Sequence, residues 1–394
     1  MSSLSSRTKT FTDSVIRRMT RICLKHNAVN LSQGFPDWEP PKAVTDRLAK
    51  VAHSGPHQYA VTWGAANFRQ ALAKKQKHFT GLSVDPEQEI VTTCGGTEAM
   101  MVAVMSVADP GDKVVIFSPF YENYGADAIL CGAEPIYVPL VPPAYGFDPD
   151  VLEAAFCQRP KAMILCNPSN PSGKVFTRKE LQVIADLAER YDVWVITDEV
   201  YEHILYDPFE MVYFSTLPKM RERTITCGSL SKTYSITGWR LGYVIAPPHV
   251  IEVARKVHDF LTVGAAAPLQ EAAVTALEFD DSYYAWLKAH YTKRRNLLLD
   301  GLRRIGLSHT EPQGAYYIMV DISAFGYASD TEFCEALAEF VGVGAVPGSA
   351  FFHEPITHYM RLHFAKNEAT LNDALTRLSD IRKKMPHRRN PHLT

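Results

Sequence analysis

The chain has 394 residues, of which 46% are hydrophobic and 21% are charged, and its formal net charge is −2. This composition is typical of a globular protein that is long enough for two domains. The near-neutral charge provides no basic surface for nucleic acid or for an anionic membrane, so we expect neither partner.

Seven cysteines are spread along the chain without a C-x-x-C pair. An odd number of cysteines without metal-ligand spacing predicts reduced thiols in a cytoplasmic protein, and no metal site. The first residues lack the apolar core of a secretory signal, and no apolar run approaches the roughly 18 residues that a membrane span needs. We therefore expect a soluble, cytoplasmic protein.

Seven short apolar runs in the first two thirds of the chain have the composition of strands buried on both faces of a mainly parallel sheet. They are Glu89–Thr93, Lys113–Ser118, Pro135–Leu140, Lys161–Asn167, Val193–Thr197, Thr224–Cys227 and Leu241–Ala246. Helical periodicity lies between them, at Glu98–Val107, Asp148–Phe156 and Arg178–Arg190. Thr177 and Glu180 form a capping box before the last of these helices. The pattern predicts an α/β fold with helices on both faces of the sheet.

The pattern changes in the last third of the chain, after a long helical region at about residues 248–305. Two predicted strands, Ala315–Ile322 and His358–Ala365, mix with two predicted helices, Thr331–Val341 and Glu368–Met385. Few strands mixed with terminal helices favour a smaller α+β domain beside the large sheet.

Ligands of an open α/β sheet bind beyond the carboxyl ends of its strands, and four segments place polar residues there. Gly95-Gly96-Thr97 follows the first predicted strand and precedes a helix. It fits either a phosphate at a helix N-terminus or plain turn geometry. Asn167-Pro168-Ser169-Asn170-Pro171-Ser172-Gly173 follows the fourth strand as a stiff loop. The loop explains the prolines, but the rigid position of Asn170 above the sheet leaves a binding role open.

Asp198 lies in Thr197-Asp198-Glu199-Val200-Tyr201, where an apolar strand ends. A carboxylate at such a place is partly buried and needs a partner. The partner is either a protonated ring nitrogen, whose charge a carboxylate stabilises, or the N-terminus of a following helix. Tyr201 lies three residues on and is close enough to face the same space.

Lys232 lies in a serine-rich turn after another predicted strand, with Ser229 before it and Arg240 after it. An amine in a sheltered pocket has a lowered pKa, which makes it available for imine formation. Ser229 offers a hydroxyl donor and Arg240 a planar guanidinium suited to phosphate. A plain surface lysine is the alternative, and the Ser/Gly/Trp/Arg surroundings argue against it.

Several motifs occur together in one order along almost the whole chain. They are Leu31-Ser32-Gln33-Gly34-Phe35-Pro36-Asp37, Gln58-Tyr59 with Gly64, Asn170-Pro171-Ser172-Gly173, Asp198-Glu199-Val200-Tyr201, Ser229-Leu230-Ser231-Lys232, Gly238-Trp239-Arg240 and Tyr359-Met360-Arg361. In order and separation they resemble the fold-type-I aspartate-aminotransferase superfamily, from about residue 11 to 384. Within it, the chain most resembles the branch with kynurenine/glutamine, methionine and succinyl-diaminopimelate aminotransferases.

The resemblance implies pyridoxal 5′-phosphate (PLP) as the cofactor, with Lys232 holding it as an imine and moving a proton between the substrate Cα and C4′. Asp198 would pair with the pyridinium nitrogen and keep the ring an electron sink. Tyr201 and Asn170 would hydrogen-bond the phenolate oxygen of the ring. The other implied cofactor contacts are Tyr121, stacked on the ring, and a phosphate site made by Gly96, Thr97, Ser229 and Arg240.

The resemblance also implies how the chain is divided and assembled. Tyr59 would reach the phosphate of the neighbouring subunit, so the active site needs a homodimer. We expect an N-terminal arm with part of the small domain at 1–45, a large PLP-binding domain at 46–289 and a small C-terminal domain at 290–394. The fold class expected is then a seven-stranded, mainly parallel sheet between helices, plus a smaller α+β domain built from both termini.

Arg361 can be placed by strand alternation. On the predicted strand 358–365, Met360, Leu362 and Phe364 share one face and Arg361 lies on the other. The apolar face can pack on its own domain while Arg361 faces the cleft and binds a substrate carboxylate bidentately. A surface salt bridge is the alternative.

The substrate side chain is less well determined. Gly34, Trp38 and Asn170 are implied to join Arg361 in binding the substrate, and Phe260–Gly264 at the pocket edge is uncharged. No second arginine aligns with one that would bind a dicarboxylate side chain. We therefore expect a roomy, partly apolar pocket that favours aromatic, methionine-like or glutamine-like amino acids over aspartate.

Three functions remain open at this point. The chain is an aminotransferase that moves an amino group between an L-amino acid and a 2-oxo acid by a ping-pong PLP mechanism, a PLP-dependent C–S β-lyase, or a non-catalytic PLP-binding module. The two enzymes share every cofactor residue named above. A regulatory module usually carries a DNA-binding extension, and we expect none before residue 11.

Overall fold

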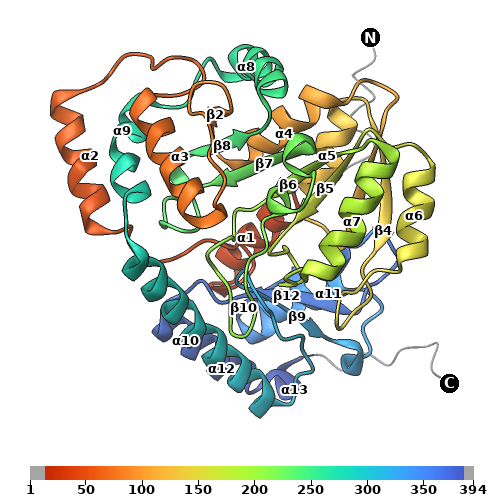
Figure 1. Ribbon diagram of the computed structural model, residues 1–394. Coiled ribbons are helices and arrows are strands. Elements are labelled where there is room, and N and C mark those ends of the chain that lie inside the picture. The colour runs from red at the N-terminus through yellow and green to blue at the C-terminus, as the bar shows by residue number, and fades with distance from the viewer. Residues whose placement is uncertain (1–13, 386–394) are drawn as a thin grey trace, which may run out of the picture.

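The computed structural model describes residues 14–385, and its largest feature is a seven-stranded sheet (Figure 1). The strand order is β2-β8-β7-β6-β5-β3-β4. The strands are β2 (Ile90–Thr93), β3 (Lys113–Ser118), β4 (Glu134–Pro139), β5 (Ala162–Cys166), β6 (Trp194–Asp198), β7 (Thr224–Ser229) and β8 (Gly242–Ile245). All neighbours are parallel except β8, which is antiparallel to both β2 and β7. The predicted seven-stranded, mainly parallel sheet is confirmed.

Side chains alternate along each strand, so apolar residues reach both faces of the sheet. On β5, Ile164 and Cys166 pack into one core cluster, whereas Met163 and Leu165 pack into another. The first cluster is closed by α4 (Gly96–Val107), α5 (Asn123–Leu130) and α8 (Pro248–Thr262), and the second by α6 (Pro149–Cys157) and α7 (Arg178–Tyr191). Because both faces are covered, the strands are near-continuous apolar runs. The predicted capping box at Thr177 is present at the start of α7.

Three further helices pack together beside the β2 edge of the sheet (Figure 1). They are α2 (Lys42–Ser54), α3 (Ala66–Thr80) and α9 (Ala267–Leu277). Phe68 and Leu72 of α3 share their core cluster with Leu230 and Tyr234, which flank the predicted Lys232. The packing of this group therefore fixes the turn that carries the lysine.

A second, smaller core lies below the large sheet in Figure 1 and joins the two ends of the described chain. Its sheets are β11-β12-β9 and the parallel pair β1-β10. Its elements are α1 (Val15–Lys25), β1 (Val29–Asn30), α10 (Asp281–Ile305), β9 (Tyr317–Asp321), α11 (Asp330–Ala336), β10 (Val343–Gly344), β11 (Val346–Pro347), β12 (Tyr359–His363), α12 (Glu368–Leu378) and α13 (Ile381–Lys384). The expected smaller α+β part is present.

Two details differ from the sequence-based expectations. The predicted helix 368–385 is broken after Leu378 and resumes at Ile381. The predicted helix 331–341 continues beyond α11 as a π-helical segment, Leu337–Val341. The expected boundary between residues 289 and 290 falls inside α10, and the ends of the expected ranges 1–45 and 290–394 lie outside the described residues. The domain limits stay a prediction.

No helix between residues 14 and 385 is both long and apolar enough to cross a membrane. Over the same residues, no group of three or more His, Cys, Asp or Glu side chains could hold a metal ion. All seven cysteines are free thiols.

Candidate active site

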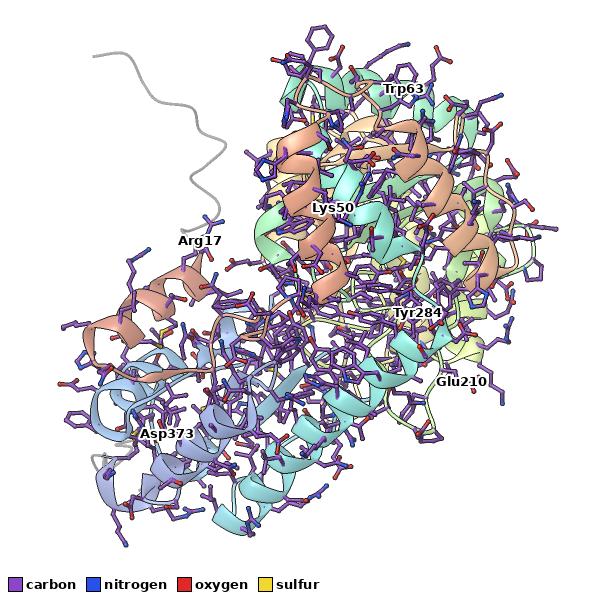
Figure 2. The ribbon with its side chains drawn as sticks, turned by 90° about the vertical axis from the view of Figure 1, so that its left-hand side faces the viewer. Arg17, Lys50, Trp63, Glu210, Tyr284 and Asp373 are labelled. Atoms are coloured by element: carbon purple, nitrogen blue, oxygen red, sulfur yellow. The ribbon has the colours of Figure 1, made fainter. Side chains whose placement is uncertain are left out.

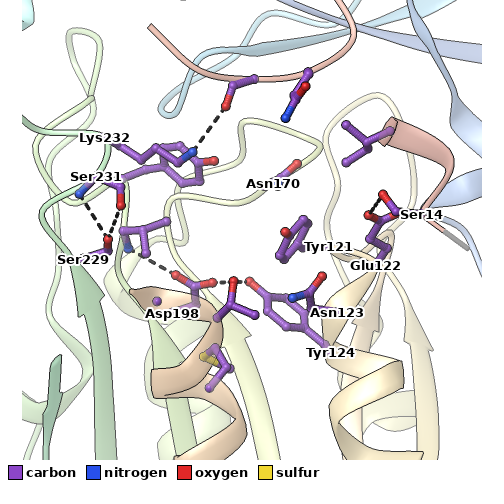
Figure 3. A pocket seen from close by; sticks show the side chains of 18 of the residues that line it. Ser14, Tyr121, Glu122, Asn123, Tyr124, Asn170, Asp198, Ser229, Ser231 and Lys232 are labelled. Carbon is purple, nitrogen blue, oxygen red and sulfur yellow. Dashed lines mark hydrogen bonds between the residues drawn. The ribbon is translucent and has the colours of Figure 1, made fainter. Parts of the chain in front are cut away.

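A cavity of about 220 Å³ lies at the carboxyl ends of β5, β6 and β7, between the large sheet and the smaller core. Figure 3 shows Lys232 on one side of it, Tyr121 and Tyr124 on the other, and Asp198 at its floor. Most of the residues predicted from the sequence line it, namely Gly34, Gly96, Thr97, Tyr121, Asn170, Asp198, Tyr201, Ser229, Lys232, Arg240 and Arg361. The segments that carry them are far apart in sequence, and the fold brings them together at this one place.

Asp198 is the last residue of β6, and its side chain is buried. Tyr124 donates a hydrogen bond to Oδ2 at 2.6 Å, and the Val200 N–H donates to Oδ1 at 3.2 Å. Burial raises the pKa of Asp198, while the Tyr124 hydrogen bond and the charge of Lys232 act in the opposite direction. The residues after Asp198 form turns, so this carboxylate does not cap a helix. A buried carboxylate held at the floor of a cavity is placed to stabilise a cation above it.

Lys232 extends into the cavity, and its Nζ donates a hydrogen bond to the Gly34 carbonyl at 3.2 Å. No carboxylate among residues 14–385 forms an ion pair with it. Burial lowers its pKa from the ordinary 10.5 to about 8, and the positive charges of Arg240 and Arg361 act in the same direction. A substantial fraction of the amine is therefore neutral near physiological pH, which is the reactive form of a lysine nucleophile.

An anion site lies beside the lysine, where α4 begins. Gly95 has φ +87°, and a Cβ there would collide with the guanidinium of Arg240. Arg240 donates hydrogen bonds to the carbonyls of Thr237 at 3.1 Å and Cys94 at 3.4 Å, which hold its guanidinium against this turn. The N-terminal N–H groups of α4 and the guanidinium together favour a phosphate. The Ser229 hydroxyl lies on the same side of the cavity and bonds the hydroxyl of Ser231 at 2.8 Å.

Arg361 is 1% exposed and lies between the rings of Tyr317 and Phe351, 4.2 and 4.4 Å from their centroids. Its two terminal nitrogens donate to Asn170 Oδ1 at 2.7 Å and to the Ser32 carbonyl at 3.0 Å, while its Nε has no partner. The alternation predicted for its strand is present, since Met360 and Leu362 lie in the smaller core. A buried guanidinium with unused donors at a cavity wall suits a carboxylate.

Aromatic side chains line much of the remaining wall of the cavity. Tyr201 shares a hydrogen bond with Tyr317 at 2.8 Å, and Tyr121 meets Tyr124 edge-on at 5.8 Å between ring centroids. Burial raises the pKa values of Tyr121 and Tyr201, so both hydroxyls stay protonated and can donate. These rings can sandwich a planar ligand and bond its polar edge.

Two predicted site residues lie outside this cavity. Trp38 packs edge-on against His290 and Tyr291, at centroid distances of 4.5 and 5.4 Å, and lines a separate hollow. Tyr59 is 86% exposed and lies in the segment between α2 and α3. Their predicted roles, toward the substrate and toward a second subunit, stay predictions.

The sequence reading missed several cavity residues. Tyr124, which donates a hydrogen bond to Asp198, lies three residues after Tyr121 in the first turn of α5, a helix that we did not predict. Tyr317 lies on a predicted strand, but nothing in the sequence pairs it with Tyr201 or Arg361. Arg17 and its neighbours come from α1, a helix that we did not predict.

Comparisons with known proteins agree with this geometry. Residues 26–378 match the family model of class I and II aminotransferases. The chain is 36% identical to a probable N-succinyldiaminopimelate aminotransferase of Mycobacterium tuberculosis, over 95% of this chain and 97% of that protein. It is 34% identical to the methionine aminotransferase of Escherichia coli, over 93% and 95% of the two chains.

A solved structure shows the same agreement in three dimensions. The N-succinyldiaminopimelate aminotransferase of Mycobacterium tuberculosis superimposes with a TM-score of 0.92, at 36% identity, over 96% of this chain and 99% of that one. Human kynurenine–oxoglutarate transaminase 1 is 33% identical over 89% of this chain and 92% of its own length. Sequence, fold and site together place this chain in the family of class I and II aminotransferases, and it is an enzyme that moves an amino group between an amino acid and a 2-oxo acid.

Proposed function

We propose that the cavity binds pyridoxal phosphate through Lys232 and that the enzyme takes a large, uncharged L-amino acid as amino donor. The observation that carries the cofactor proposal is the position of Lys232. Its amine, with a pKa of about 8, lies in one cavity with a carboxylate at the floor and with an anion site at the start of α4. The amine suits the aldehyde of pyridoxal phosphate, the carboxylate suits its ring nitrogen, and the anion site suits its phosphate.

Each residue then has a definite task. Lys232 attaches the cofactor and, when its amine is free, moves the proton at the substrate Cα. Asp198 would stabilise a positive charge at the ring nitrogen, and Asn170 and Tyr201 would hydrogen-bond the phenolate oxygen of the ring. The phosphate would be held by Gly96, Thr97, Ser229 and Arg240. When bound, the cofactor supplies an electron sink for the bond broken at Cα.

Arg361 would orient the substrate by its α-carboxylate. A bidentate grip fixes which bond at Cα is held perpendicular to the cofactor ring, so the α-proton is the one removed. The substrate side chain would then extend past Ile16, Tyr121 and Gln33, which line the same cavity. Apolar and amide groups at these positions favour aromatic, methionine-like or glutamine-like side chains. The similarity to a methionine aminotransferase and to a kynurenine–oxoglutarate transaminase supports this choice.

A panel of amino acids and 2-oxo acids tests the donor class. Purified enzyme with added PLP should form 2-oxo acid fastest from methionine, glutamine and aromatic donors, and much more slowly from aspartate. Thiol and pyruvate release from cysteine conjugates is followed in the same samples. A rate of thiol release above the exchange rate would make this chain a C–S lyase, an alternative that the aminotransferase names of its relatives do not favour.

We also propose a homodimer in which Tyr59 completes the partner's site. Apolar side chains are exposed over two segments that adjoin each other, with Tyr59 at 86%, Phe260 at 92% and Val61 at 50% exposure. His258 joins the segments through a hydrogen bond to the Thr62 carbonyl at 3.0 Å. Exposed apolar area of this kind is typical of an interface.

Hybrid dimers test the shared site. A Lys232→Ala chain and a Tyr59→Ala chain, unfolded and refolded together, should give dimers with one intact site and one doubly altered site. Activity above the sum of the two parents supports sharing. Absence of recovery, with hybrid dimers shown by two affinity tags, would mean that Tyr59 does not serve the partner.

A cytoplasmic location is proposed on the seven free thiols, several of them buried in apolar clusters. Free cysteines in such number are typical of a reducing compartment. Fractionation of the source cells, with the enzyme detected by antibody, should place it in the soluble cytoplasmic fraction. Recovery in an oxidising compartment would contradict the proposal.

A further inference from the structure

We propose that a surface hollow beside the turn of Lys232 binds a small quaternary ammonium ion, and that the bound ion changes the surroundings of the cofactor. This aromatic hollow, lined by Trp38 and by one face of α10, has a volume of about 400 Å³. None of its lining residues lines the cavity that contains Lys232. The effect on the cofactor rests on the proposed function, whereas the binding of the ion does not.

The wall of the aromatic hollow is a row of four rings. Tyr283, Trp286 and His290 are spaced by three and four residues on α10, so they share one face of the helix. The ring centroid of Trp286 lies 5.6 Å from that of Tyr283 and 4.7 Å from that of His290. His290 in turn contacts Trp38, at 4.5 Å between centroids. Trp286 is 47% exposed, so a ligand can reach a π-system that attracts cations to its face.

The charge of the hollow also favours a cation. Glu39 lines it as an exposed carboxylate and forms no ion pair within residues 14–385. Burial, and next the charge of Arg294, lowers the pKa of His290 from the ordinary 6.5 to about 4, so this imidazole is neutral at physiological pH. Arg294 is buried and lies over the Trp38 ring at 5.0 Å, and no other ring of the row has a cation over it in the described part of the chain. The hollow therefore has one negative charge and three rings without a cation.

The wall favours a quaternary head over a primary ammonium group. A primary ammonium group brings three N–H donors that need acceptors, and the faces of the rings supply few of them. A quaternary ammonium ion has no N–H group. Its methyl groups can pack on the rings while its charge is attracted to their faces and to Glu39. The volume of the hollow leaves room for a short chain on the nitrogen.

The hollow borders both segments that hold the side chain of Lys232. Tyr283, at one end of the row, donates a hydrogen bond at 2.6 Å to the carbonyl of Thr233, the residue after Lys232. The same turn also lines the hollow directly. On the other side, Trp38 follows the segment of Gly34, whose carbonyl accepts the hydrogen bond from the lysine. A ligand that displaces Tyr283 or Trp38 would therefore alter the position of the amine.

The place of the hollow can be followed in Figure 2. Tyr284, in the first turn of α10, lies where the large-sheet part of the molecule meets the smaller core. Trp63, beside the exposed segment that we propose for subunit contact, lies far from it in the same view. The aromatic hollow is thus apart from the surface proposed for the homodimer.

The first test compares choline with 3,3-dimethyl-1-butanol, which has the same shape but carries a carbon in place of the charged nitrogen. Ligand-observed NMR titrations of the PLP-loaded enzyme, at an ionic strength held constant with NaCl, give the two dissociation constants. Choline should bind at least about five-fold more tightly, because only the cation gains from the rings and from Glu39. Equal constants for the two compounds would overturn the proposal.

Substitutions in the wall locate the site. Trp286→Leu should weaken choline binding by about five-fold, with little change for the alcohol, and Trp286→Phe should keep most of the affinity because a π-face remains. Glu39→Gln should weaken choline binding by about two- to three-fold. The matched control Glu222→Gln removes an exposed carboxylate that does not line the hollow, and it should change nothing. Thermal melting checks the fold of each variant, and an unchanged choline affinity in Trp286→Leu would show that the ion binds elsewhere.

The second test measures the effect on the cofactor. Choline should shift the visible absorbance of the bound PLP and lower kcat at saturating donor, because the amine of Lys232 is displaced. Both effects should reach their midpoints at the dissociation constant measured by NMR, and Trp286→Leu should weaken both. Inhibition that is relieved by saturating donor would place choline in the main cavity and overturn the separate site.

Two further outcomes separate the parts of the proposal. Choline that binds without a change in absorbance or in kcat would overturn the effect on the cofactor. If the purified protein binds no PLP and transfers no amino group, the proposed function is wrong. The choline titrations of that protein then still decide whether the aromatic hollow binds a quaternary ammonium ion.

Discussion

Lys75 is buried and Lys232 is partly buried in the large-sheet part of the molecule, and the two lysines differ in how they are paired. The Nζ of Lys75, on α3, lies 2.6 Å from Glu202, and both side chains are buried. Glu202 also accepts hydrogen bonds from Tyr213 at 2.9 Å and Tyr243 at 3.3 Å. Lys232 reaches only a backbone carbonyl at 3.2 Å.

The difference in pairing has electrostatic consequences. Burial alone would raise the pKa of Glu202, but the charges of His203 and Lys75 hold it well below its usual range. Burial and the charges of Arg240 and Arg361 lower the pKa of Lys232 to about 8, and the charge of Asp198, which is not in contact, offsets only part of this lowering. A buried lysine with a carboxylate in contact holds the structure together. Lys232, which has no carboxylate in contact, has an amine free for chemistry.

Removal of the unpaired amine should have the largest effect on activity. Lys232→Ala should lower the transamination rate by at least about 10³-fold, because no other group can attach the cofactor and move the Cα proton. The fold should survive, since no ion pair is lost. Rates are measured with saturating PLP and no added amine, and circular dichroism checks the fold. A variant with more than a few per cent of wild-type activity would show that another residue does this work.

The second largest effect on activity is expected for Asp198, the carboxylate at the cavity floor. Asp198→Asn keeps the shape and the hydrogen bond from Tyr124, but a neutral amide cannot stabilise a positive ring nitrogen in a buried place. We expect kcat to fall by about 10²- to 10³-fold, as when one preorganised electrostatic contact is removed from other enzymes. Single-turnover kinetics with the best donor measure this. A rate within a few-fold of wild type would remove Asp198 from the mechanism.

Substitution of Lys75, which is paired with Glu202, should lower the stability strongly and the turnover only slightly. Lys75→Met leaves the Glu202 carboxylate buried without its cation, which costs about 3–5 kcal/mol of unfolding free energy. The turnover of the molecules that remain folded should change by less than ten-fold. Lys42→Met is the control, because it breaks the exposed Lys42–Asp46 pair and should cost about 0.5 kcal/mol or less. Urea unfolding of the three proteins gives the free energies. Equal costs for the two variants would refute the contrast.

The smallest effect is a pH dependence of stability in the protein without cofactor. Lys232 loses its proton near pH 8 when folded and near 10.5 when unfolded. Between these values the unfolded chain holds more protons, so the stability of wild type rises with pH relative to Lys232→Met. Below pH 8 the difference between the two proteins is constant. Urea titrations at several pH values from 7 to 10.5 measure it, and parallel curves would mean that the folded amine has an ordinary pKa.

The large sheet and the centre of the site could be predicted because their signals are local. Apolar runs mark the seven strands. Asp198 ends β6, and Asn170 and Lys232 lie within about four residues of the ends of β5 and β7, where strand ends must converge. Alternation on one strand was enough to place Arg361 opposite its apolar neighbours. These inferences need only the period of a strand and the direction of the sheet.

The features that could not be predicted from the sequence depend on contacts between segments that are far apart in the chain. Lys75 and Glu202 are 127 positions apart, so nothing in the sequence could pair them. Trp38 stands next to a site motif, yet its ring packs on α10 rather than lining the cavity. Arg17 lies on the amphipathic helix α1, but the amphipathic pattern does not tell which cavity the first turn of that helix reaches. The direction of a side chain on a loop or a helix end is set by packing, which short-range periodicity does not report.

The central claim is that Lys232, and not another buried lysine, holds the cofactor. The protein is loaded with PLP, reduced with borohydride to fix the cofactor on the lysine that carries it, and cleaved for mass spectrometry of the peptides. The account predicts a single pyridoxyl-modified lysine at Lys232, in near-stoichiometric yield, with Lys75 unmodified. Modification of Lys75 or of any other lysine at comparable yield, with Lys232 left free, would contradict it.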